Sequence, residues 1–385
     1  MKKGLVMEGG AMRGLFTCGV IDVFMENGIT FDGAVGISAG AVFGCNYKSH
    51  QHGRPRRYNK TFCRDPRYGS FRSWLKSGDL FDVDFCYRVI PEELDPFDAE
   101  AFGKDPMEFY IGASDVMSGE CVFHLCSDGL ERDMLWMRAS ASMPLVSRIV
   151  EVDGYKLLDG GICDSIPYAF MKSKGYDRNV VILTQPRGYR KEKNRLMPLI
   201  NIALKDYPLI CDAMAKRHII YNRETAQIYE DQKDGLVFVI QPPESLKIGR
   251  TEKDPEELER VYQIGRKEAK DHLEELKKFL SEEYAPVQRS ERMRKKIRKH
   301  FQFYGEVQGV GFRFQAMRAA DALGLTGWVK NEYDGSVTME IQGSAEEIDA
   351  ALSMISNSRY IHIDRTDERV VPLEDDEHGF NADYW

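Results

Sequence analysis

The sequence of 385 residues has no apolar run that approaches the roughly 18 to 20 residues of a membrane-spanning helix. It also has no secretory signal, because the apolar run that follows Lys2 and Lys3 breaks within a few residues. We therefore expect a cytoplasmic protein. Any contact with a membrane is expected to be peripheral, at the bilayer surface.

Excess positive charge and paired cysteines are also absent. The net charge is −8, with both signs spread along the chain, so binding to nucleic acid is not expected. The eight cysteines form no Cys-x-x-Cys pair, which favours reduced thiols. His124, between Cys121 and Cys126, is too sparse a cluster to predict a zinc site. The sequence therefore predicts no metal and no cofactor.

The first part of the chain alternates short apolar runs with helical patterns. Apolar runs at 5–7 and 34–37 predict strands, and helices are expected at 15–27 and from residue 39 onward. A further apolar run at 179–183 has the pattern of a fully buried strand. This alternation predicts a three-layer α/β domain with a mainly parallel sheet.

Three later segments differ in composition. Residues 48–72 are rich in His, Arg, Lys and Tyr, which predicts an exposed, partly helical excursion. Residues 254–283 have the spacing of one long amphipathic helix that ends before Pro286. A basic run at 289–300 then suggests a solvated linker, which leads us to place the domains at 1–285 and 296–385 with a linker at 286–295.

The last ninety residues predict a small α+β domain. Helices are expected at 312–323 and 345–355, and a hairpin turn at Asp334-Gly335 joins two strands. With a first strand after His300 and a last strand at 360–370, the order is βαββαβ, which is the ferredoxin-like arrangement.

One short motif in the first domain points to a nucleophile. Gly36-Ile37-Ser38-Ala39-Gly40 has the form Gly-x-Ser-x-Gly and lies between a predicted strand and a predicted helix. Such a turn projects the serine hydroxyl away from the backbone, and its glycines relieve crowding. The motif predicts a nucleophilic serine at Ser38.

Two further glycine-containing motifs accompany it. Gly9, Gly10 and Ala11 follow the first strand, where consecutive N–H groups are suited to an oxyanion or a phosphate. The loop has neither the spacing of a dinucleotide-binding fingerprint nor the Gly-Lys-Ser/Thr of a P-loop. Asp159, at the end of a predicted strand before two glycines, is either a ligand-facing carboxylate or part of a tight turn.

In this order the three motifs resemble the patatin-like phospholipase family over residues 1–280. The resemblance implies a serine esterase without a catalytic histidine, in which Ser38 is the nucleophile and Asp159 the general base. The amides of Gly9, Gly10 and Ala11 would form the oxyanion hole. Ala11 stands where the family usually has glycine. The resemblance also includes the basic loop residue Arg13 and the segment Ala139–Pro144, which resembles a family stretch that packs beside the site.

A histidine-containing triad is the alternative mechanism. The candidate bases are His50, His52, His124 and His218, of which His50 and His52 lie in a charged stretch that favours solvation at the surface.

The glycine-rich loop at 305–311, followed by Phe312 and Arg313, suits an anion bound at a helix N-terminus. Together with Gly327–Asn331, it resembles the acylphosphatase family over residues 296–385. The resemblance implies hydrolysis of acyl phosphates, with Arg313 binding the phosphate and Asn331 positioning the attacking water.

The sequence thus predicts a lipid acyl hydrolase fused to an acylphosphatase. The alternative makes acylphosphatase the main activity and the first domain a platform for lipid or partner binding. The expected partners are a lipid ester, a membrane surface contacted peripherally, and an acyl phosphate or phosphate at the C-terminal domain.

Overall fold

The computed structural model describes residues 1–281, 296–356, 361–374, 377 and 379–382. Contacts within the chain divide it into two units, Met1–Val287 and Gln288–Trp385. The expected linker at 286–295 and the predicted end of the first domain at residue 285 lie outside the described residues.

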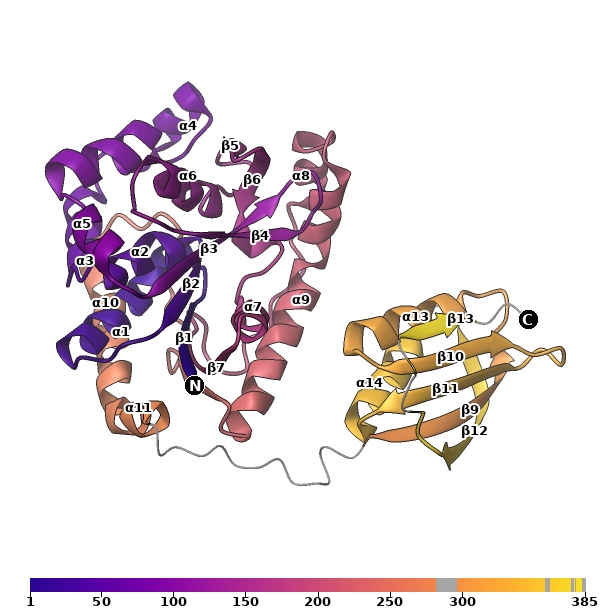
Figure 1. Cartoon of the computed structure of the whole chain (residues 1–385). Coiled ribbons are helices and arrows are strands. Elements are labelled where there is room, and N and C mark those ends of the chain that lie inside the picture. The colour runs from indigo at the N-terminus through magenta and orange to yellow at the C-terminus, as the bar shows by residue number, and fades with distance from the viewer. Residues whose placement is uncertain (282–295, 357–360, 375–376, 378, 383–385) are drawn as a thin grey trace. The chain divides into compact units, whose positions relative to one another are not determined.

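The first unit is built on a mixed sheet with the strand order β5-β6-β3-β2-β1-β7-β8, and β4 pairs with β3 (Figure 1). Neighbouring strands from β3 to β8 along this order are parallel, while β4 and β6 are antiparallel to β3. The strands are β1 (Lys2–Met7), β2 (Gly33–Ile37), β3 (Glu108–Asp115), β4 (Cys121–Leu125), β5 (Val150–Val152), β6 (Tyr155–Asp159), β7 (Tyr176–Ile182) and β8 (Val237–Ile240).

Helices cover both faces of this sheet. The longer ones are α1 (Gly14–Glu26), α2 (Ala39–Lys48), α3 (Arg54–Phe62), α6 (Glu131–Ser140), α9 (Pro208–Lys233), α10 (Pro255–Asp271), α11 (Leu273–Leu280) and the π-helix η2 (Phe85–Leu94). The shorter ones are η1 (Ala11–Arg13), α4 (Phe71–Ser77), α5 (Ala99–Lys104), η3 (Gly160–Ile162), α7 (Tyr168–Ser173) and α8 (Met197–Ala203).

The alternation of strand side chains produces the three layers. Leu5 and Met7 of β1 pack in one core with α1, α2 and α10, whereas Val6 between them packs in a second core with α7 and α9. Figure 1 shows these two groups of helices on opposite sides of the sheet. The predicted three-layer α/β domain with a mainly parallel sheet is confirmed.

The second unit is an α+β sandwich whose two helices pack in one core with its sheet. Its elements are β9 (Ile297–Glu306), α13 (Phe312–Leu323), β10 (Thr326–Asn331), β11 (Val337–Gly343), α14 (Ala345–Ser356), β12 (His362–Val371) and β13 (Phe380–Ala382). The strand order is β12-β9-β11-β10-β13. The predicted βαββαβ order is confirmed, and the sequence did not reveal β13, which pairs in parallel with β10.

Two predictions about segments were wrong in part. Residues 48–72 contain α3 and are thus partly helical, as expected, but Arg54, Tyr58, Asn59 and Tyr68 are buried, not exposed. The buried polar groups have partners inside the fold, since Arg54 Nη1 donates to Asn46 Oδ1 at 3.0 Å. The single helix expected at 254–283 is two helices, because the backbone leaves the helical conformation at His272.

In the described part of the chain, no helix is long and apolar enough to cross a membrane.

Candidate active site

Ser38 occupies a sharp turn between β2 and α2. Its φ of 54° and ψ of −122° are a conformation that L-residues rarely adopt. The turn brings the backbone close to its neighbours, since a Cβ on Gly36 would lie 2.4 Å from the Gly40 carbonyl oxygen. A Cβ on Gly40 would lie 2.3 Å from the carbonyl oxygen of Met7. The two glycines are therefore required for this turn, as expected for a nucleophile elbow.

Asp159 contacts the Ser38 hydroxyl directly. Ser38 Oγ donates to Asp159 Oδ2 at 2.7 Å, and the Gly161 N–H donates to Asp159 Oδ1 at 2.8 Å. Sheet register explains the meeting, because β2 pairs with β3 through Ile37, and the adjacent β3 residue Ala113 pairs with Asp159.

The environment of Asp159 favours its role as a proton acceptor. The side chain is buried, and this burial raises the pKa of the carboxyl above its ordinary value. The positive charge of Arg217 and the hydrogen bonds from Ser38 and Gly161 act in the opposite direction and lower the pKa. The result is a carboxylate held out of water that already accepts the proton of a hydroxyl group.

The glycine-rich loop after β1 lies against the nucleophile. A Cβ on Gly9 would lie 3.1 Å from Ser38 Cβ. The Gly9 N–H donates to the Ser165 carbonyl at 3.5 Å, whereas the N–H groups of Gly10 and Ala11 have no hydrogen-bond acceptor within the described residues. Ala11 has a φ of 48°, so this position does demand the backbone conformation that glycine adopts more easily.

Arg13 is placed beside this loop, in η1. Its Nε donates to Thr184 Oγ1 at 3.4 Å, just beyond the end of β7. Arg13 is thus held at the carboxyl edge of the sheet, together with the other predicted site residues of the first unit.

Two residues of the site were not assigned individually from the sequence. Ser140 Oγ accepts the N–H of Ser38 at 2.8 Å and donates to the Gly112 carbonyl at 2.6 Å. Arg217 on α9 is the cation with the largest effect on the pKa of Asp159. Ser140 belongs to the segment 139–144, whose sequence resembles the patatin-like family. Arg217 lies in a charged helix that contains no recognisable motif.

The candidate histidines of a triad lie elsewhere. Nε2 of His50, His52 and His124 pairs with Asp105, Glu26 and Asp133, respectively, each at 2.7 to 2.8 Å. His218 lines a second cavity, which is described below. Ser38 Oγ instead bonds to Asp159, without a histidine between them.

One group of side chains in the described residues has the spacing of metal ligands. His124, Cys126 and Asp133 place one ligand atom each within 4.8 Å of one another. However, Asp133 Oδ1 bonds to His124, and Asp133 Oδ2 accepts N–H groups from Ser127, Asp128 and Gly129. These hydrogen bonds join β4 to α6, so the cluster has a structural role without a metal ion.

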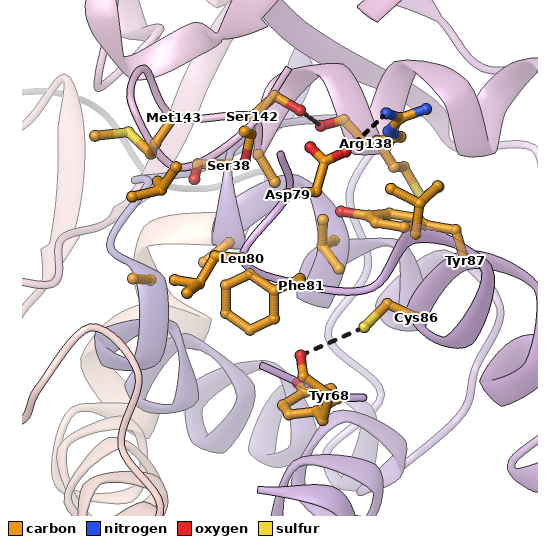
Figure 2. Close-up of a pocket in the computed structure, with 18 of the residues that line it drawn as sticks. Ser38, Tyr68, Asp79, Leu80, Phe81, Cys86, Tyr87, Arg138, Ser142 and Met143 are labelled. Atoms are coloured by element: carbon orange, nitrogen blue, oxygen red, sulfur yellow. Dashed lines mark hydrogen bonds and ion pairs between the residues drawn. The ribbon is translucent and has the colours of Figure 1, made fainter. Parts of the chain in front are cut away.

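A largely apolar pocket opens beside Ser38 (Figure 2). Its volume is about 390 Å³. Its apolar walls include Val42, Phe43, Tyr58, Phe81, Tyr87 and Met137. Figure 2 shows Ser38 near Met143, with the Asp79–Arg138 ion pair (3.6 Å) as a polar feature of the wall. Such a pocket suits a hydrocarbon chain next to the reacting group.

The predicted site of the second unit lies at one end of its sheet. Arg313 is in the first turn of α13, and Asn331 is the last residue of β10. Gln308 Nε2 donates to the carbonyls of Glu332 and Ser336, each at 2.7 Å. This side chain ties the loop before Arg313 to the turn after Asn331.

Comparison with known proteins agrees with this division. Residues 5–171 match patatin-like phospholipases, residues 207–281 match a domain of unknown function (DUF6363), and residues 299–382 match acylphosphatases. The protein YjjU of Escherichia coli (strain K12) is 28% identical over 74% of this chain and 80% of its own length. Lysophospholipase NTE1 of Coccidioides immitis (strain RS) is 26% identical over 77% of this chain, which spans only 19% of that protein.

The second unit has its own relatives. An acylphosphatase of Bifidobacterium longum (strain NCC 2705) is 37% identical over 81 residues, which make up 21% of this chain and 84% of that protein. The crystal structure of the acylphosphatase from Bacillus subtilis covers 23% of this chain and 99% of its own, with 28% identity and a TM-score of 0.22.

The fold and these matches define a hydrolase made of two domains. More particularly, the chain belongs to the acylphosphatase family through its C-terminal unit, and its N-terminal unit contains a patatin-like phospholipase domain.

Proposed function

We propose that the first unit hydrolyses the carboxylic esters of lipids through a dyad of Ser38 and Asp159. The observation that carries this proposal is the 2.7 Å hydrogen bond from Ser38 Oγ to Asp159 Oδ2, beside an apolar pocket. The match to patatin-like phospholipases supports the same reaction class.

The reaction would proceed in two halves. Ser38 Oγ attacks the ester carbonyl while its proton passes to Asp159, which gives a tetrahedral oxyanion. Collapse breaks the ester C–O bond, and the leaving alcohol takes the proton from Asp159. Water then attacks the acyl-serine, again with Asp159 as base, and releases the fatty acid and the free serine.

The oxyanion would be stabilised by the loop after β1. The Ser38 N–H is already bonded to Ser140, so it is not free to donate to the intermediate. The N–H groups of Gly10 and Ala11 are without acceptors in the described residues and lie in the loop that contacts Ser38. Gly9 would then act mainly by permitting the close approach of this loop, since its own N–H bonds to Ser165.

Replacement of the nucleophile tests the proposal. Ser38→Ala is expected to reduce ester turnover by at least about 10³-fold, because the covalent step is removed. Ser142→Ala is the matched control, since this serine lines the same pocket but its hydroxyl donates to the Arg138 carbonyl. Ester hydrolysis that survives in Ser38→Ala would contradict the assignment.

We further propose that this unit contacts a lipid surface peripherally. Phe71 and Leu75 of α4 are exposed, and so are Leu199 and Ile202 of α8. Figure 1 shows α4 and α8 at the same edge of the unit. Trp74 Nε1 donates to the Leu145 carbonyl at 2.9 Å, which joins α4 to the wall of the pocket. Exposed apolar side chains beside a pocket for an acyl chain suit insertion among lipids.

Co-sedimentation with vesicles tests this contact. The double variant Phe71→Ser/Leu75→Ser is expected to lower the bound fraction at least about 3-fold, because apolar area inserted into the bilayer is lost. Ile219→Ser on α9 is the matched control, since Ile219 is also exposed but lies on another helix. Equal binding of the double variant and the wild type would refute the contact.

For the second unit we propose acyl phosphate hydrolysis, with Arg313 binding the phosphate and Asn331 positioning water. Support comes from the family match and from the Gln308 hydrogen bonds that tie together the segments carrying these residues. Arg313→Ala is expected to lower turnover of benzoyl phosphate by at least about 10²-fold, since a charge-assisted contact to phosphate is lost. Full activity of this variant would reject the role of Arg313.

A further inference from the structure

A second cavity lies next to the pocket of the nucleophile. Its volume is about 530 Å³. It shares five lining residues with the apolar pocket, namely Met143, Pro144, Leu145, Leu196 and Arg250. A molecule whose ester is bound at Ser38 can therefore extend past this shared wall into the second cavity.

The second cavity is strongly cationic. Its basic lining residues, apart from His218, are Arg190, Lys191, Lys193, Arg195, Arg217 and Arg250. The single carboxylate in the lining, Glu192, pairs with Arg195 at 3.7 Å. Within the described residues, the other five cations form no ion pair. In the lining of this cavity, positive side chains thus outnumber negative ones by six to one.

The pKa values of two cations in this cavity are lowered, because burial and mutual repulsion disfavour their charged forms. Burial, followed by repulsion from Arg217, lowers the pKa of Lys191 to about 7. The pKa of Arg217 is also lowered, first by burial, and its buried Nε has no hydrogen-bond partner in the described structure. An anion in the cavity would offset both the repulsion and the missing hydrogen bond.

Asp159 and Glu8 both lie near this cluster, and the carboxylate of Glu8 is engaged by other groups. Glu8 has both oxygens occupied, since Oε2 accepts the Thr184 N–H and Oε1 accepts the Tyr221 hydroxyl at 2.9 Å. Lys191 Nζ lies 4.1 Å from the centre of the Tyr221 ring, and its backbone is fixed by two hydrogen bonds with Asn222. Lys191 is therefore held in place by the fold.

One cation of the cavity also lies next to the proposed base, Asp159. A Cβ on Gly161 would lie 3.0 Å from Asp159 Oδ1 and 3.2 Å from Arg217 Nη2. The Arg217 guanidinium therefore lies beside the proposed base and also lines the cavity. In a phospholipid, only a few bonds separate the acyl ester from the phosphate, which matches two sites that share a wall.

We propose that this cavity binds the phosphate of an anionic lipid headgroup and makes the enzyme selective for phosphate-bearing esters. The inference rests on the proposed esterase function. A zwitterionic headgroup fits less well, because the one carboxylate in the lining is already paired with Arg195. The segment that matches a domain of unknown function, residues 207–281, contributes Arg217, His218 and Arg250 to this cavity. Its role would be to supply part of the headgroup site.

Three substrates with one identical acyl chain test the proposal on the full-length chain. These are lysophosphatidic acid, lysophosphatidylcholine and monoacylglycerol, each used below its micellar concentration. We expect kcat/KM for lysophosphatidic acid to exceed that for each of the other two at least about 10-fold. In Lys191→Gln and in Arg250→Gln this ratio should fall at least about 5-fold. Lys216→Gln on α9, whose side chain pairs with Asp212, is the matched control that should keep the ratio.

Free phosphate is the other source of the same chemistry, so its binding is measured by calorimetry. Arg313→Ala is present in each protein compared, to remove the phosphate site of the second unit. Suppose that phosphate binds, that Lys191→Gln weakens this binding, and that the three esters have similar kcat/KM values. This result would overturn the headgroup assignment and would show a site for free phosphate. If the ratio of kcat/KM values is near one and phosphate does not bind, the cavity is not an anion site. Failure to hydrolyse any of the three esters would overturn the esterase proposal itself, and the inference with it.

Discussion

At the scale of single residues, the site of the first unit combines unfavourable features. Ser38 has a positive φ, Ala11 has a φ of 48° without being glycine, and Asp159 is a buried carboxylate. Each of these costs free energy of folding, and such features persist where the surrounding structure fixes them. Their concentration around one hydrogen bond supports a catalytic role for this bond.

Asp159→Asn should therefore change activity and stability in opposite directions. The raised pKa of Asp159 means that the folded state favours the neutral carboxyl. Its contribution to stability is complete below the ordinary aspartate range near 3.8 and is lost as pH rises through the raised pKa. The permanently neutral amide is thus expected to give a higher Tm at pH 8, with a smaller gain at pH 4.5.

Ester turnover by the same variant should fall at least about 10³-fold, because no proton acceptor remains for Ser38. Thermal unfolding at the two pH values and ester kinetics check both parts. Retained turnover, or a Tm at pH 8 below that of the wild type, would contradict this account of Asp159.

Short motifs made Ser38, Asp159 and the Gly9–Ala11 loop visible in the sequence, because such turns demand particular residues. Ser140 and Arg217 act through tertiary contacts that no local pattern encodes. Arg217 is one of several charged residues on a long helix, and its meeting with Asp159 depends on how α9 packs against η3.

At the scale of elements, helix α9 connects the sheet to both cavities. Tyr221 contacts Glu8, and Arg217 faces Asp159. Glu224 lies on the same helix and interacts with Asp164, which follows η3. Burial, followed by the Asp164 charge, raises the pKa of Glu224 well above its usual range. The pair therefore holds a proton at neutral pH.

Glu224→Gln should make stability less sensitive to alkaline pH. A carboxyl with a raised pKa stabilises the fold fully below its ordinary pKa of 4.5, and this contribution is lost as pH rises. The amide keeps a neutral group at the position, so the variant is expected to exceed the wild type in Tm at pH 9 by more than at pH 6. If the Tm of the wild type and that of Glu224→Gln fall by the same amount between pH 6 and pH 9, the Glu224–Asp164 pair does not hold a proton at neutral pH.

The sequence predicted strands and helices well where one periodicity dominates, as in β2, α1 and α13. It failed at 48–72 because polar residues such as Arg54 and Asn59 suggest solvent. In the structure, Arg54 bonds to Asn46 and to the Asp95 carbonyl, and Asn59 bonds to Tyr68. The break at His272 was equally hidden, since the charged pattern continues across it without proline or glycine.

At the scale of the whole molecule, two units with separate hydrophobic cores carry two separate sites. The composition and the motif order sufficed to predict both fold classes. The choice of headgroup depends on a cavity assembled from the loop at 189–196, α9 and Arg250, which lie far apart in sequence.

The two activities should therefore be separable by single substitutions. Ser38→Ala is expected to leave turnover of benzoyl phosphate within about 2-fold of the wild type, and Arg313→Ala to do the same for ester turnover, because each residue belongs to one unit. Both variants are assayed with both substrates. Loss of both activities in either variant would show that the sites depend on each other.

The most direct test of the central claim is covalent labelling by a fluorophosphonate, followed by mass spectrometry of the peptides. The account predicts one adduct on Ser38 in the wild type, with loss of ester hydrolysis in proportion to labelling, and no adduct in Ser38→Ala. Ester hydrolysis that continues with Ser38 fully labelled, or an adduct that forms on another residue and abolishes activity, would contradict it.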